Sequence, residues 1–115
     1  MASLAFAAPI LPGKLTAWKQ FAAELNGPRR AAFAAQQRRI GMTCHRAYLQ
    51  QTPNGDFVIV YTEGKDPGRS MGAIGASKVA FDVWFKAQVK AIHGIDLTKP
   101  PAGPLSVQAL DYKAR

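Results

Sequence analysis

The sequence has a single cysteine, Cys44, and few acidic residues, with 7 aspartates and glutamates against 15 lysines and arginines. One cysteine excludes an internal disulfide framework and a zinc site built from several cysteines. No apolar run is long enough to span a membrane, and the opening MASLAFAAPILPG lacks the basic start of a signal peptide. We therefore expect a cytoplasmic protein with no membrane partner.

The excess of basic residues gives a formal net charge of +8, which favours encounter with anionic partners such as nucleic acid or acidic metabolites. The positive charges are spread along the chain, and the densest groups are the pairs Arg29-Arg30 and Arg38-Arg39. Basic tails carry longer runs than these. We interpret the charge mostly as solvated helix surface.

Length and composition predict one globular domain over residues 1–115, because 48% of the residues are hydrophobic and 19% are charged. Apolar spacing and turn residues predict its elements in order. These are a strand in SLAFAAPI, a broken helix over 14–39 ending at Gly41, a hairpin over about 42–62, a short glycine-interrupted helix before Ser77, a helix from Ser77 to His93, and a closing strand in LSVQALDY.

This order predicts an α+β fold of the ferredoxin-like βαββαβ type, with a four-stranded antiparallel sheet and the helices on one face. The other face of the sheet must then be covered from outside, since the chain has no third layer to offer.

The hairpin stretch YLQQTPNGDFVIVYTEG contains Asn54-Gly55, the strongest short hairpin signal, as the two residues of a type I′ turn. That turn predicts Arg46 opposite Glu63, as an ion pair, and an aromatic pair of Tyr48 and Tyr61. One hairpin face is small and aliphatic (Ala47, Leu49, Val58, Val60), which suits packing under helices. The other is larger and mixed (Arg46, Tyr48, Gln50, Phe57, Ile59, Tyr61, Glu63).

Left in water, the mixed face would be a sizeable apolar patch of a kind that monomers rarely keep. We expect it to meet an identical surface, so that two chains form a two-fold dimer whose sheets enclose a cavity. Polar groups inside that cavity would be obliged to pair with one another or with a ligand.

Three segments resemble a known group of proteins: LPGKLTAWKQFAAELNGPRR, YLQQTPNGDFVIVY and FDVWFKAQVKAIHGIDL. They are similar to the dimeric α+β barrel superfamily, and more narrowly to a small bacterial family with no assigned activity. The superfamily includes antibiotic-biosynthesis-type monooxygenases, muconolactone isomerases, polyketide cyclases and stress-responsive barrel proteins. The resemblance implies a homodimer and a small organic ligand, and it supplies no catalytic residues.

The candidate catalytic residues are Tyr61, Glu63 and His93, and the candidate ligand-binding residues are Arg46, Tyr48, Gln50, Phe57 and Ile59. In this interpretation Arg46 and Glu63 hold a ligand oxygen, and the tyrosines orient an aromatic or enolisable substrate or donate a proton. Each has a structural alternative, as an ion pair at the barrel rim or as packing in the dimer core.

His93 ends the last helix, where it can cap carbonyls or form a general base with Asp96. His45 falls on the helix-facing side of its strand, and its neighbour Cys44 points to the opposite face, which disfavours a Cys–His pair. The two histidines lack metal-ligand spacing, so we expect no metal and no cofactor.

Two functions compete: a small-molecule-binding barrel, either a cofactor-independent monooxygenase, isomerase or cyclase or a binding protein without catalysis, and an RNA-binding module of the same topology. The RNA interpretation is disfavoured because the basic-Gly-aromatic opening of that motif is missing, with Asp56 in its place.

Overall fold

The computed structural model describes residues 2–114, which form an α+β arrangement of one three-stranded antiparallel sheet and four helices. The strands are β1 (Ala2–Pro9), β2 (Met42–Thr52) and β3 (Gly55–Gly64), in the order β1-β3-β2. The helices are α1 (Leu15–Asn26), α2 (Arg30–Arg39), α3 (Pro67–Ala76) and α4 (Ala80–His93). This strand order is compatible with a ferredoxin-like fold.

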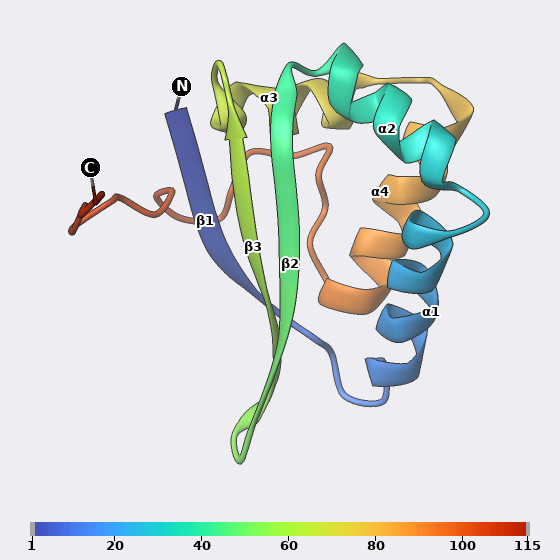
Figure 1. Cartoon of the computed structure of the whole chain (residues 1–115). Helices are drawn as coiled ribbons and strands as arrows, with labels where there is room; N and C mark the ends of the chain where they lie inside the picture. Colours follow the sequence, from blue (N-terminus) through green and yellow to red (C-terminus); the bar gives the residue numbers. More distant parts are fainter. Residues whose placement is uncertain (1, 115) are drawn as a thin grey trace.

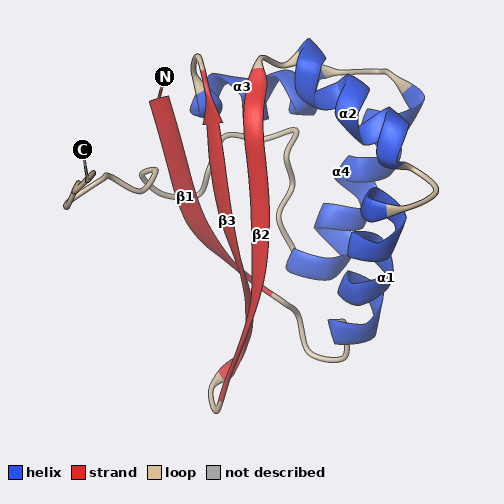
Figure 2. Ribbon diagram, in the orientation of Figure 1, coloured by secondary structure: helices blue, strands red, loops and turns tan. Residues whose placement is uncertain are grey.

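Helices α1, α2 and α4 lie on one side of the sheet, and α3 lies across the end at which β3 finishes (Figure 1). Figure 2 shows that none of the helices reaches the opposite side of the sheet. That opposite side is called the open face below. The expectation of helices on one face is therefore confirmed for α1, α2 and α4.

Local signals set the ends of these helices. Asp66 caps α3, where its side chain accepts a hydrogen bond from the backbone N–H of Arg69, and Pro67 occupies the first turn. Gly94 ends α4 in the left-handed conformation, with φ 70°, as its position predicts. Helix α4 begins at Ala80 rather than directly after Ser77: Val79 is its N-cap residue, and no side chain caps it. The Ser77 hydroxyl instead donates to Asp82 and accepts from the N–H of Val79.

The core lies between the sheet and the helices. Val58 and Val60 of β3 face this side and meet Phe21 of α1 together with Phe85 and Ile92 of α4. The rings of Phe21 and Phe85 lie 5.4 Å apart in a tilted arrangement that aromatic pairs favour. Each such side chain stabilises the fold by roughly 1.5–3 kcal/mol through burial.

The predicted hairpin register is wrong by two residues. Thr52 pairs with Gly55, so the turn is made by Pro53 and Asn54, and Arg46 lies opposite Tyr61 rather than Glu63. Proline has no N–H to donate to the ladder, so it is favoured in the turn over a paired position. The Thr52 hydroxyl completes the turn by donating to the Gly55 carbonyl oxygen at 2.7 Å.

A shift of two residues preserves the two faces of the hairpin and changes only the partners. Tyr48 is opposite Ile59, so the expected pair of Tyr48 with Tyr61 is not formed. Within residues 2–114 the ion pairs join Arg29 to Glu24 and Arg39 to Asp82, so the expected Arg46–Glu63 ion pair is also absent.

The predicted fourth strand is wrong as well: LSVQALDY is extended chain without strand pairing. The segment passes the free edge of β1, where the Ser106 hydroxyl donates to the carbonyl oxygen of Ala5. Beyond that point the side chains of Val107, Leu110 and Tyr112 are 85–86% exposed. Strand-forming residues stabilise a strand by burying one face, and these three side chains bury almost nothing.

Candidate functional site

The open face carries the seven side chains that the alternation predicted for it. In β3, Val58, Val60 and Thr62 are buried toward the helices, and the residues between them are half-buried on the open face. The open-face set comprises Arg46, Tyr48, Gln50, Phe57, Ile59, Tyr61 and Glu63. Cys44 lies beside this set, opposite Glu63, whereas His45 faces the helices as expected.

Tyr61 and Glu63 are brought together on this face, near the end of the central strand β3. The Tyr61 hydroxyl donates to Oε2 of Glu63 at 2.5 Å, a short charge-assisted hydrogen bond. Residues i and i+2 of a strand share a face, so the extended backbone of β3 by itself aims both side chains the same way. The hydrogen bond to Glu63 raises the pKa of Tyr61, with burial adding to the rise and a hydrogen bond with Ser3 opposing it.

A tyrosine with the ordinary pKa of about 10 is already protonated at neutral pH, and the rise moves Tyr61 further from ionisation, so Tyr61 is suited to donate a hydrogen bond rather than to act as a base. Arg46 lies directly across from Tyr61 on β2 and is exposed, as are Tyr48 and Gln50. Gln50 is opposite Phe57. The open face therefore combines a carboxylate, a phenol and a guanidinium with apolar neighbours, which is the composition of a small-molecule site.

His93 does not join this group, because it lies on the helix side of the sheet. Its Nδ1 is 2.7 Å from the carbonyl oxygen of Pro9, to which it donates, and this contact ties the end of α4 to the end of β1. Burial lowers the pKa of His93, and the hydrogen bond to Pro9 partly opposes the change. Asp96 is not the hydrogen-bond partner of His93: its carboxylate accepts from the N–H and hydroxyl of Thr98.

Both histidines border a small apolar cavity of about 110 Å³ between the sheet and α1 and α4. His45 bonds to the side chain of Gln37 at 3.2 Å and meets the ring of Phe33 edge-on. Burial lowers the pKa of His45, so this imidazole is held neutral. The expectation that His45 faces the helices is confirmed, and the side chain is half-buried with a hydrogen-bond partner.

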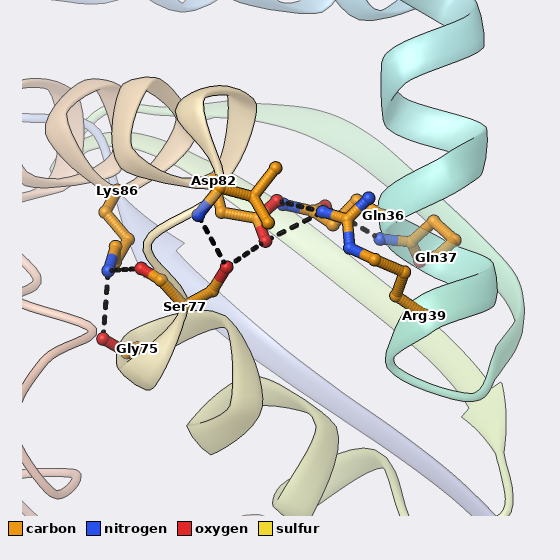
Figure 3. A network of polar contacts seen from close by, with 8 residues as sticks. Gln36, Gln37, Arg39, Gly75, Ser77, Asp82 and Lys86 are labelled. Atoms are coloured by element: carbon orange, nitrogen blue, oxygen red, sulfur yellow. Dashed lines mark hydrogen bonds and ion pairs between the residues drawn. The ribbon is translucent and has the colours of Figure 1, made fainter.

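A buried polar network around Asp82 was not predicted from the sequence (Figure 3). The Asp82 side chain is 1% exposed and accepts hydrogen bonds from Gln36 at 2.9 Å, Arg39 at 2.8 Å and Ser77 at 2.6 Å. Lys86 joins the same region by donating to the carbonyl oxygens of Gly75 and Ser77.

Burial alone would raise the pKa of Asp82, but the hydrogen bonds from Ser77, Arg39 and Gln36 outweigh it and hold the pKa below its usual range. With its oxygens taken by three donors, this carboxylate serves to lock α2 against α4. A sequence signal for it exists: Asp82 shares a helix face with Phe85, Val89 and Ile92 through spacings of three and four. A carboxylate within an apolar stripe predicts a buried partner.

Compared with protein-family models, curated proteins and solved structures, the chain shows no significant match. Within residues 2–114, no helix has the length and apolar character needed to cross a bilayer. In the same part of the chain, His, Cys, Asp and Glu side chains form no group of three or more that would hold a metal ion.

Proposed function

We propose that the protein is a homodimer whose two open faces enclose a small-molecule site, with Glu63 as proton acceptor and Tyr61 as hydrogen-bond donor. The observation that carries this proposal is the 2.5 Å hydrogen bond between Tyr61 and Glu63 on a sheet face that the chain itself leaves uncovered. Half-buried Phe57 and Ile59 beside the pair support association through this face.

The chemistry that suits this pair is proton abstraction from an enolisable or phenolic substrate. Oε2 of Glu63 is occupied by Tyr61, which leaves Oε1 to receive the proton, while the exposed guanidinium of Arg46 stabilises the resulting oxyanion. Proton abstraction is the first step that isomerases, cyclases and cofactor-independent monooxygenases can share. The proposal therefore includes those three reaction classes and requires no cofactor.

Oligomeric state tests the first half of the proposal. Light scattering should show a dimer for the wild-type protein and a folded monomer for Ile59→Arg, which places a charge at the centre of the open face. Val83→Arg is the matched control, because Val83 is 51% exposed on α4, away from the open face. A monomeric wild-type protein, or an Ile59→Arg variant that still dimerises, would contradict the enclosed site.

Deuterium exchange tests the second half. The dimer should accelerate exchange of the C–H beside the carbonyl of phenylacetone, measured by NMR, and Glu63→Gln should reduce the rate at least about a hundredfold, as expected for loss of a general base. Tyr61→Phe removes the hydrogen-bond donor of the pair. Its control is Tyr112→Phe, because Tyr112 lies on the exposed C-terminal segment. A dimer that binds phenylacetone without exchange would point to the non-catalytic binding function.

A further inference from the structure

A second, larger hollow lies on the helix side of the sheet and does not include Tyr61 or Glu63. Its volume is about 950 Å³, and it is bounded by β1, α3 and the chain that follows α4. Leu4 and Phe6 of β1 form one wall, and the segment from Gly94 to Ser106 covers it on its way from α4 to the edge of β1 (Figure 1). Small-molecule pockets span about 300–1,000 Å³, so this hollow is ligand-sized rather than a packing defect.

The wall supplied by α3 is hollowed by Gly68, Gly72 and Gly75, which follow one helix face at spacings of four and three. Two of these glycines are explained by the covering segment. A Cβ at Gly75 would lie 2.0 Å from the carbonyl oxygen of Leu97, and one at Gly68 would lie 3.1 Å from Cδ1 of Leu105.

Gly72 has no such explanation, because a Cβ there would meet nothing within 4 Å. Glycine inside a helix is destabilising relative to residues with side chains, and the backbone here does not require it. The missing side chain at Gly72 leaves volume in the cavity that packing within the chain does not use.

The charged side chains that line the cavity are Asp96 and Lys99, and Thr98 between them and Ser106 at the edge of β1 add hydroxyl groups. Oδ1 of Asp96 is engaged by the N–H of Thr98 at 2.9 Å and by its hydroxyl at 2.5 Å. Lys99 is exposed and belongs to neither of the ion pairs found within residues 2–114, but it is near enough to act on Asp96: hydrogen bonds from Thr98, helped by the charges of Lys90 and Lys99, lower the pKa of Asp96. Two charged side chains, Asp96 and Lys99, therefore line an otherwise apolar hollow. Oδ1 of Asp96 already has its hydrogen bonds from Thr98, so the exposed ammonium of Lys99 is the group at this end that suits the negative end of an amphipathic molecule.

We propose that this cavity binds a small amphipathic carboxylate of the medium-chain fatty-acid class. The hydrocarbon chain lies against Phe6, Met71 and Leu97, and the carboxylate lies at the rim beside Lys99. The site is separate from the open face and does not depend on dimerisation or on any activity of Tyr61 and Glu63.

Titration calorimetry with octanoate tests the location. Octanoate should bind the wild-type protein saturably, and Gly72→Leu should weaken binding at least about tenfold, because a leucine displaces roughly two methylenes of the ligand chain. Ala91→Leu, on the exposed surface of α4, is the matched control and should bind like wild type. Absence of octanoate binding to the wild type, or equal binding by Gly72→Leu, would overturn the proposal.

Two further measurements make the test specific. Lys99→Gln should weaken octanoate about two- to fivefold, the size of an exposed ion pair, and leave octan-1-ol binding unchanged; an unchanged octanoate affinity would overturn the assignment of a carboxylate ligand. Should Gly72→Leu fail to fold, methyl NMR of the wild-type protein tests the location instead. Octanoate must then shift the methyl resonances of Met71, Leu97 and Leu105 and leave those of Ile59 unchanged. A cavity filled by the C-terminal segment of a second copy would instead exclude octanoate from the dimer, which contradicts the proposal.

Discussion

Nη2 of Arg39 lies 2.8 Å from both carboxylate oxygens of Asp82, although the two residues are 43 positions apart in the sequence. The contact joins the last turn of α2 to the first turn of α4, and Gln36 and Ser77 complete the bonding of the same carboxylate. The Arg39 side chain is 39% exposed whereas that of Asp82 is 1% exposed, so Arg39 connects the buried carboxylate to the protein surface.

Replacing Asp82 by asparagine should destabilise the protein by about 3 kcal/mol, at the lower end for breaking a buried ion pair, because Arg39 can still reach water. Urea unfolding followed by circular dichroism measures the change. Glu24→Gln is the control: it removes the other ion pair, with Arg29, whose partners are both more than 40% exposed, and should cost under about 1 kcal/mol. Equal losses in the two variants would show that the Asp82 network does not lock the helices.

Stability should also fall in mild acid because of His45 and His93. Burial lowers the pKa of both side chains in the folded protein, whereas in the unfolded chain histidine titrates near about 6.5. Above that pH both states are neutral and these groups have no effect. Below it the unfolded chain binds protons that the folded chain does not, so the free energy of unfolding decreases as the pH falls through about 6.5.

The measurement is urea unfolding at about pH 7.5 and about pH 5.5, with a lower free energy of unfolding expected at the lower pH. His45→Gln keeps a hydrogen-bonding partner for Gln37. It should reduce the acid-induced decrease in the free energy of unfolding by the part that His45 contributes. A loss as large in this variant as in the wild type would assign the acid sensitivity to other groups. Asp82 titrates below this window, since its pKa is lowered.

The Tyr61–Glu63 hydrogen bond has its own signature in the titration of the phenol. Because Glu63 is the main cause of the raised pKa of Tyr61, Glu63→Gln should bring that pKa down toward the ordinary value for tyrosine. NMR of tyrosine labelled at the carbon beside the hydroxyl follows Tyr61 directly. A pKa that stays raised in Glu63→Gln would mean that burial, rather than the hydrogen bond, dominates at this site.

Two glycines should respond in opposite directions to the same substitution. Gly94→Ala should cost roughly 1 to 2 kcal/mol, because φ is 70° and Cβ atoms are disfavoured there, although a Cβ would find only ordinary contacts with Leu11. Gly72→Ala should stabilise by roughly 0.5–1 kcal/mol, because it adds a helix former in open space. Thermal unfolding of both variants checks the pair, and a destabilised Gly72→Ala would show that the space at this helix face is already filled.

The open-face residues could be predicted from the sequence because strand alternation is a local property. The side-chain period of two survives any even shift of register, so Tyr61 and Glu63 fall on one face whether Arg46 or Cys44 lies opposite Glu63. The pairing itself could not be predicted in the same way. It depended on whether Pro53 stands in the turn or in the ladder, and the lack of a proline N–H decided for the turn.

The sequence by itself determined the approximate positions of three strands and of the helices, the end of α4 at Gly94, and the separation of the hairpin into two faces, since each follows from neighbours a few residues apart. Only the tertiary structure decided the rest. It left LSVQALDY unpaired because strand propensity needs a surface to bury against, and it joined Asp82 to Arg39 because a desolvated carboxylate must find its donors across the fold. The cavity under the C-terminal segment likewise exists only because three distant parts of the chain enclose it.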